Sequence, residues 1–167
     1  MNNGTTSFDY LYERFYQRLE KDRDFFDYYN VSLEEAKELA QKRAKNYLID
    51  ALDILCSVGG LEVDFTDYDE ETEQINFETT KTENRIIVEL MFQVYMERDV
   101  PLLHAFQINF TPSDLNIITP STERTTYLNL VDKLKKDNEI RIDGYKNRDR
   151  KTGKHKYTIN YSAYADF

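Results

Sequence analysis

One segment constrains the fold more than any other, the helical repeat that begins after Ser32 and ends before Gly59-Gly60. Ser32 and Glu35 have the S-x-x-E spacing of a capping box, in which each side chain bonds a backbone N–H of the first helical turn. Glycine accepts the left-handed conformation that ends many helices. Between these signals, apolar side chains recur at three- and four-residue intervals: Leu33, Ala36, Leu39, Ala40, Ala44, Tyr47, Leu48, Ala51, Leu52 and Leu55. The pattern predicts one long helix with one buried face.

Three further segments share this helical period. The first runs from about Ser7 to Lys21. The second begins at another capping box, Thr80 with Glu83, and ends before Pro101, and the third runs from about Ser121 to Asn138. The sequence therefore predicts a mainly α fold, a four-helix bundle-like domain with long loops over residues 1–138.

Residues 139–167 predict a C-terminal arm that is extended or folded as a β-hairpin. Two apolar residues alternate on one side of a basic, glycine-containing turn, and three alternate on the other: Ile140 and Ile142, then Tyr157, Ile159 and Tyr161. Because an isolated hairpin is only marginally stable in water, we expect this arm to need a partner surface. A further short strand is predicted in the connection before the last helix, at Phe106, Ile108 and Phe110.

Charge is distributed unevenly along the chain, whose formal net charge is −9. Residues 62–78 carry eight carboxylates and no cation, whereas residues 141–156 carry seven cations against Asp143 and Asp149. The overall charge disfavours simple binding to nucleic acid or to an anionic membrane. The polarity predicts contact between the acidic part of one copy and the basic part of another, and solvated loops explain it almost as well.

The acidic loop has part of the spacing of a calcium-binding loop. Carboxylates occupy positions one, three, five, seven and twelve of such a loop: Asp67, Asp69, Glu71, Glu73 and Glu78. Thr72 stands at position six, where the sharp turn of that loop requires glycine. A solvated acidic loop is therefore favoured over a calcium site.

Other catalytic and metal-binding patterns are weak. His104, His155 and Cys56 lie in three separate segments, which disfavours zinc. The sequence has no glycine-rich phosphate loop and no nucleophile motif, so we expect neither an enzyme nor a cofactor. A single cysteine allows no internal disulfide. Without a signal-peptide pattern or an apolar run of roughly 18 residues, we expect a soluble protein made in a cytoplasm.

Two stretches carry a resemblance to a known family. The first is Asp64-Phe65-Thr66-Asp67-Tyr68-Asp69, then Ile75-Asn76-Phe77 and Thr82-Glu83, leading into the apolar helix from Ile86 to Met96. The second is DLNIITPSTERTTYLNLVDKLKKDNEIRIDGY. Together they make residues 10–145 resemble the head–tail connector (adaptor) proteins of the neck of tailed bacteriophages.

That resemblance implies a structural virion protein, synthesised in the host cytoplasm. Identical subunits, typically twelve, would form a ring beneath the portal protein, extend the DNA channel and join the capsid to a downstream neck or tail protein. DNA would pass through the lumen without specific binding, because an acidic lumen repels phosphates.

We expect two groups of interface residues in such a ring. The lumen, or a contact between subunits, would take residues of the acidic loop: Asp64, Asp67, Tyr68, Asp69, Glu70, Glu71, Glu73 and Phe77. The portal would take residues of the C-terminal arm: Arg148, Arg150, Lys151, Tyr157, Ile159 and Tyr161. Adding a strand to the edge of a partner sheet is one way in which such an arm docks.

Two other classes of function stay open at this point. An acidic interaction protein, such as a DNA-mimicking inhibitor of a DNA-binding enzyme, would spread carboxylates over one surface, whereas here they cluster in one loop beside a basic tail. A metal-dependent hydrolase would use the carboxylates from Asp67 to Glu78, and its melting temperature would rise with magnesium, manganese or calcium.

Overall fold

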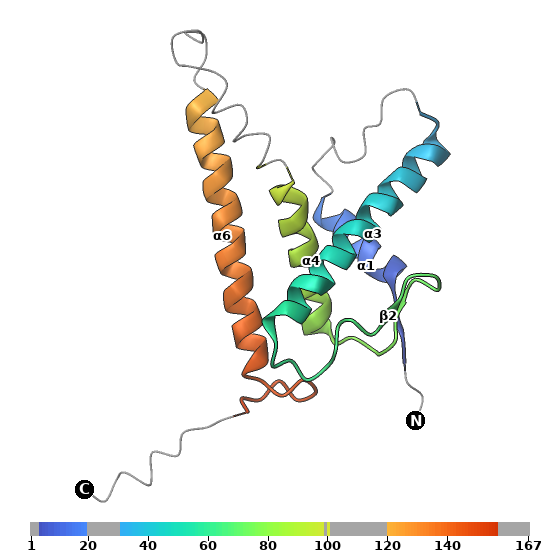
Figure 1. Ribbon diagram of the computed structural model, residues 1–167, viewed down its shortest axis with the longest axis vertical. Helices are drawn as coiled ribbons and strands as arrows, with labels where there is room; N and C mark the ends of the chain where they lie inside the picture. Colours follow the sequence, from blue (N-terminus) through green and yellow to red (C-terminus); the bar gives the residue numbers. More distant parts are fainter. Residues whose placement is uncertain (1–3, 20–30, 99, 101–119, 157–167) are drawn as a thin grey trace, which may run out of the picture.

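Helices dominate the computed structural model, which describes residues 4–19, 31–98, 100 and 120–156 (Figure 1). In chain order the elements are β1 (Thr6–Ser7), α1 (Phe8–Arg18), α3 (Leu33–Val58), β2 (Tyr68–Asp69), β3 (Gln74–Ile75), α4 (Lys81–Glu97) and α6 (Pro120–Lys146). The predicted mainly α fold with four helices is confirmed for the described part of the chain.

Both predicted capping boxes form. The Ser32 hydroxyl accepts a hydrogen bond from the N–H of Glu35, and Glu35 Oε2 accepts one from the N–H of Ser32 at 2.9 Å. Thr80 and Glu83 make the same pair of bonds at the start of α4. At the other end of α3, Gly59 has a φ of 64°, a conformation that glycine adopts without strain. The local signals thus set the bounds of both helices.

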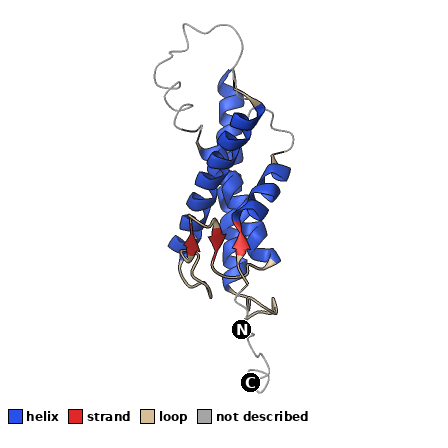
Figure 2. Ribbon diagram, turned by 90° about the vertical axis from the view of Figure 1, so that its right-hand side faces the viewer, coloured by secondary structure: helices blue, strands red, loops and turns tan. Residues whose placement is uncertain are grey.

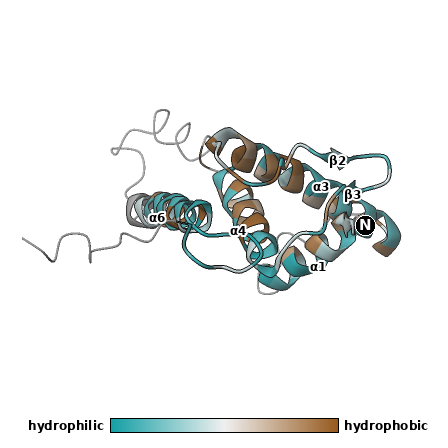
Figure 3. Ribbon diagram, turned by 90° about the horizontal axis from the view of Figure 1, so that it is seen from below, coloured by the Kyte–Doolittle hydropathy of each residue, from teal (hydrophilic) through white to brown (hydrophobic). Residues whose placement is uncertain are grey.

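Helix α4 lies at the centre and packs against α1, α3 and α6 (Figures 1 and 3). Its buried face meets the apolar stripes of α1 and α3, as the periodicity of the sequence requires. Aromatic rings join these helices, with Phe15 lying 5.9 Å from Tyr47 and 6.4 Å from Tyr95 between ring centroids. The largest fully buried side chains are Tyr12, Phe8, Phe15, Phe65, Leu11, Leu19, Leu48, Leu52, Leu55, Ile75 and Ile87.

A small antiparallel sheet covers one edge of the helices, with strand order β1-β3-β2 (Figure 2). Ile75 of β3 lies opposite both Thr6 of β1 and Tyr68 of β2, so the N-terminus completes the sheet. The acidic segment expected as a loop is therefore a hairpin of two short strands. Ile75 of this hairpin is fully buried. Glu73, in the turn between β2 and β3, has a positive φ of 52°.

The expected strand at Ile140 and Ile142 is wrong, because α6 continues to Lys146. Asn138, Ile142 and Tyr145 are spaced by four and three residues, and all three are buried, whereas Ile140 is 69% exposed. This is a helical pattern of burial. The expected boundary between the helical domain (residues 1–138) and the C-terminal arm (residues 139–167) therefore falls inside α6. The expected strand residues Phe106, Ile108 and Phe110, and the arm residues Tyr157, Ile159 and Tyr161, lie outside the described residues.

The two ends of the molecule differ in shape (Figure 1). At the lower end of that view, the start of α4 lies near the end of α6, and the sheet lies on the side of α1. Toward the other end, the first turns of α3 and of α6 diverge to opposite sides. Within the described residues, each helix is too short or too polar to cross a membrane.

Candidate functional site

The lower end of the molecule brings together two segments of opposite charge. We call residues 64–78 the acidic hairpin and residues 147–156 the basic turn. The basic turn folds on itself: Arg148 and His155 form an antiparallel bridge, and Asp149 Oδ1 accepts hydrogen bonds from the N–H and the hydroxyl of Thr152 at 2.7 and 2.6 Å. Gly153 has a φ of 68° within this turn. A turn was predicted here; its first expected arm belongs to α6, and its second lies outside the described residues.

Arg150 of the basic turn reaches into the helical body and binds Glu83. Its Nε and Nη2 lie 2.5 and 3.0 Å from the two carboxylate oxygens of Glu83, an ion pair with two hydrogen bonds. The Tyr145 hydroxyl donates to the same carboxylate, and Arg150 also donates to the carbonyl of Glu78. The Glu83 side chain is fully buried and that of Arg150 is 15% exposed. We call Glu83, Tyr145 and Arg150 the buried clasp.

Further contacts hold the basic turn against the segment that leads into the acidic hairpin. Lys156 Nζ lies 2.8 Å from Glu62, and the backbone N–H of Arg150 donates to the same carboxylate at 3.3 Å. The Arg150 guanidinium also lies over the Phe77 ring, 5.3 Å from its centroid. The acidic and basic regions were expected to meet between copies, and in this structure they meet within one chain.

Electrostatics in the buried clasp favour charged Glu83. Burial on its own would raise the pKa of Glu83, but hydrogen bonds from Arg150, Tyr145 and the Thr80 N–H outweigh burial and lower it. Burial first, and then the bond to Glu83, raises the pKa of Tyr145, so that its hydroxyl remains a donor. The clasp is thus a fully bonded ionic cluster at neutral pH.

The aspartates of the acidic hairpin bond within the hairpin itself. Asp64 Oδ1 accepts from the N–H and hydroxyl of Thr66, and Asp69 Oδ1 accepts from the N–H of Glu71. These bonds lower the pKa of both aspartates. Local bonds of this kind are the usual role of Asp in turns. No group of three or more His, Cys, Asp or Glu that could hold a metal is found in the described residues.

Lys45 of α3 anchors the tip of the acidic hairpin. Its Nζ donates to the Glu70 carbonyl at 2.8 Å and lies 3.2 Å from Glu73 Oε1. Glu70 and Glu71 themselves are exposed. The hairpin therefore presents outward-facing carboxylates on a backbone that is fixed to the helices.

The structure divides the predicted interface residues into three groups. Those with exposed side chains are Asp64, Asp67, Glu70, Glu71, Arg148 and Lys151. Those half-buried against the rest of the chain are Tyr68, Asp69, Glu73, Phe77 and Arg150. Tyr157, Ile159 and Tyr161 lie outside the described residues.

Sequence reasoning missed the two other members of the clasp. From the sequence alone, Glu83 has the role of a capping-box residue. That role accounts for the hydrogen bond that Oε2 accepts from the Thr80 N–H, but not for the burial of the side chain. Tyr145 was named only as the last residue of the segment that carries the resemblance. A carboxylate inside a helix face that is otherwise apolar was the signal for a buried cation partner, because charged groups are almost never fully buried unless paired.

Comparisons of the chain with protein-family models, with curated proteins and with solved structures found no match.

Proposed function

We propose that this protein is a head–tail connector of a tailed bacteriophage, a non-catalytic subunit that forms a ring beneath the portal. The observation that carries the proposal is the fixed acidic hairpin. Lys45 holds its tip, Arg150 holds the carbonyl of Glu78 at its base, and β1 pairs with its second strand. The resemblance of residues 10–145 to connector proteins supplies the biological setting.

A hairpin fixed in this way suits the lining of a DNA channel. Glu70 and Glu71 point into solvent, and twelve copies would present a ring of such carboxylates. Fixed negative charge repels the phosphates of DNA, so the duplex slides without binding. Arg150 and Lys156 are paired with Glu83 and Glu62 outside the hairpin, and Lys45 is paired with Glu73. This pairing leaves the exposed carboxylates Glu70 and Glu71 for the lumen.

Docking on the portal falls to the basic turn and to the residues that follow it. Arg148 and Lys151 are exposed on that turn, and the chain leaves it at Lys156 toward Tyr157, Ile159 and Tyr161. Arg150 belongs to the buried clasp, so in this proposal it orients the turn and does not itself touch the portal.

The proposal is tested by mixing the purified chain with a portal ring from the same genome and measuring the mass of the complex. We expect a monomer or small oligomer alone and a ring-sized species on the portal. Deleting residues 157–167, or the double change Arg148→Glu with Lys151→Glu, is expected to abolish docking. Lys42→Glu, an exposed charge reversal on α3, is the matched control and should still dock.

A chain that ignores the portal, or one that docks equally well after both changes, would contradict this assignment. The DNA-mimic alternative fits the structure less well, because Glu62, Glu73 and Glu83 are each paired with a cation of the same chain. Inhibition of a DNA-binding enzyme by the isolated protein would favour that alternative.

A further inference from the structure

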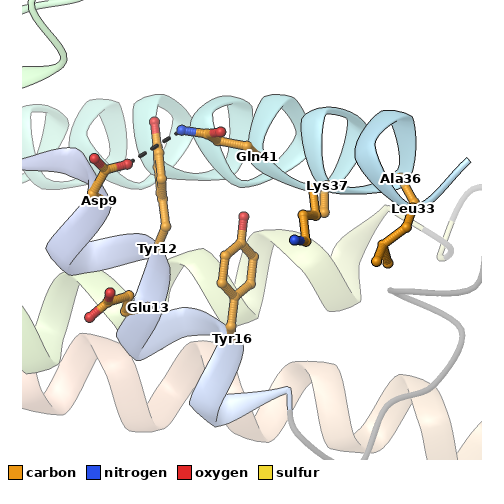
Figure 4. Close-up of a pocket in the computed structure, with 9 residues that line it drawn as sticks. Asp9, Tyr12, Glu13, Tyr16, Leu33, Ala36, Lys37 and Gln41 are labelled. Carbon is orange, nitrogen blue, oxygen red and sulfur yellow. Dashed lines mark hydrogen bonds between the residues drawn. The ribbon is translucent and has the colours of Figure 1, made fainter.

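A groove of about 500 Å³ lies between α1 and the first half of α3, on the opposite side of the molecule from α6 (Figure 4). Small side chains, Ala36 and Ala40, hollow it on the α3 side. Its remaining lining residues are Asp9, Tyr12, Glu13, Tyr16, Leu33, Lys37 and Gln41. Most of this lining is apolar, and Leu33 at one end is 73% exposed.

The floor of the groove contains an unsatisfied polar group. Tyr12 is 2% exposed, and its hydroxyl has no hydrogen-bond partner among the described residues. The hydroxyl points toward α3 beside the hydrogen bond between Asp9 and Gln41 (Figure 4). Buried hydroxyls nearly always find a partner, so within the described residues the contact between α1 and α3 leaves this polar group unpaired at the floor of the groove.

The acidic side of the groove lies on α1, where Asp9 and Glu13 are both exposed. Lys37 lines the opposite side of the groove, on α3. An occupant that offers an apolar side chain for the floor and a cation for the α1 edge is therefore complementary to this surface. Helix α6 has this combination on its exposed face. Leu130 is 44% exposed and Ile140 is 69% exposed, and the exposed Lys133 lies between them. Positions 130, 133 and 140 fall on one side of a helix, because 3.6 residues make a turn.

The two surfaces lie on opposite flanks of the central helix. In two perpendicular views, α6 stands on one side of α4 and the pair of α1 and α3 on the other (Figures 1 and 3). Surfaces that are complementary and that face away from each other cannot meet within one chain. Between copies they make a head-to-tail contact, and such contacts close into a ring when the rotation between copies permits it.

We infer that the groove between α1 and α3 binds α6 of a second copy of this chain, with Leu130 in the groove and Lys133 beside Glu13. The inference rests on the proposed function, in which copies form a ring, and it names the surfaces that build that ring. It also leaves the lower end of each subunit, with its acidic hairpin and basic turn, available for the lumen and the portal.

Cysteine cross-linking tests the contact directly. Leu33→Cys and Leu130→Cys are made separately, each with Cys56→Ser to remove the native thiol. Because both leucines are exposed, circular dichroism and melting temperature of the two variants should match those of the protein with Cys56→Ser alone. The two variants are mixed and oxidised with a mild thiol oxidant such as copper phenanthroline. A disulfide forms only where the two Cα atoms approach within about 7 Å, so a covalent dimer of one copy of each variant is expected.

Leu39→Cys is the matched control, because Leu39 is 40% exposed on the same helix and does not line the groove. It should give no mixed dimer with Leu130→Cys. One chain that carries both Leu33→Cys and Leu130→Cys should form a ladder of dimers, trimers and larger species. Absence of the mixed dimer, or equal yields with Leu39→Cys, would overturn the inference.

The same proteins separate this inference from the proposed function. If the mixed dimer forms and the parent chain does not bind the portal, the head-to-tail contact stands and the connector function fails. If the parent chain docks on the portal and no mixed dimer forms, the connector function stands and the ring uses other surfaces.

Discussion

Two helices of this protein begin with the same motif, but at opposite ends of the molecule and in different surroundings. The capping box of α3, Ser32 with Glu35, lies at the diverging end, where the side chains of both residues are exposed. The capping box of α4, Thr80 with Glu83, lies at the lower end, where Glu83 is fully buried and bonded to Arg150 and Tyr145. One motif thus only starts a helix, while the other also joins the start of α4 to the end of α6 and to the basic turn.

The two ends of the molecule also differ in how far their side chains are buried. At the lower end, Glu83, Tyr145 and Arg150 are paired in the buried clasp, and Phe65 and Ile75 of the acidic hairpin are buried. At the diverging end, Leu33 and Leu130 remain in solvent. This contrast suggests that contacts at the lower end stabilise the subunit, and that the exposed leucines toward the diverging end are used for contact between copies.

The largest effect is expected from Glu83→Ala. The substitution leaves the buried Arg150 guanidinium and the Tyr145 hydroxyl without their main partner. Removing one member of a buried ion pair typically costs about 3–5 kcal/mol. We expect the free energy of unfolding, measured in urea, to fall by about that amount. Glu35→Ala removes the equivalent residue of the exposed capping box and should cost a small fraction of this. Equal losses in the two variants would remove the distinction between the two motifs.

A similar comparison can be made along α3 alone. Leu48 is fully buried near the middle of the helix, and Leu33 is 73% exposed at its first turn. Leu48→Ala should lower the free energy of unfolding by about 2–5 kcal/mol, because it removes buried methyl groups and leaves a cavity. Leu33→Ala should change it by less than about 0.5 kcal/mol in the isolated subunit. A large loss from Leu33→Ala in a protein shown to be monomeric would mean that the diverging end is packed.

The smallest effect concerns pH and again separates the buried clasp from the exposed carboxylates. The pKa of Glu83 is lowered in the folded state from its ordinary value of 4.5. The stability that this shift contributes is present above about pH 4.5 and is lost as pH falls through the lower, folded pKa. Melting temperature should therefore decline below pH 4.5 in the parent protein and decline less in Glu83→Gln, whose amide does not titrate. Glu70→Gln, which removes an exposed carboxylate at the tip of the hairpin, is the control, and an identical decline in all three proteins would exclude Glu83 as the source.

Local signals in the sequence were sufficient for most of the helices. Capping boxes, glycine and apolar period act over a few residues, so they predicted α1, α3 and α4 correctly. The same reasoning failed at Ile140 and Ile142, because two apolar residues in alternation do not distinguish a strand from the end of a helix. Burial of Ile142 and Tyr145 against the other helices decided the matter.

In the candidate site, too, local sequence predicted some features and packing between distant segments decided others. Composition identified an acidic segment and a basic segment, and nothing local indicated that they lie together. Arg150 and Glu83 are 67 residues apart in the chain, and Thr6 pairs with Ile75 across a similar separation. Contacts at such separations depend on how the helices pack, which no short window of sequence contains.

The sequence by itself determined where the four described helices begin, which faces of α1, α3 and α4 are apolar, and how unevenly charge is placed, because these properties depend on neighbouring residues. Only the tertiary structure decided that the acidic segment is a hairpin completed by the N-terminus, and that α6 extends to Lys146. It also decided that the basic turn folds back to bury Arg150 against Glu83. These outcomes were settled by packing, since a buried charge or strand edge is stable only where a distant segment supplies its partner.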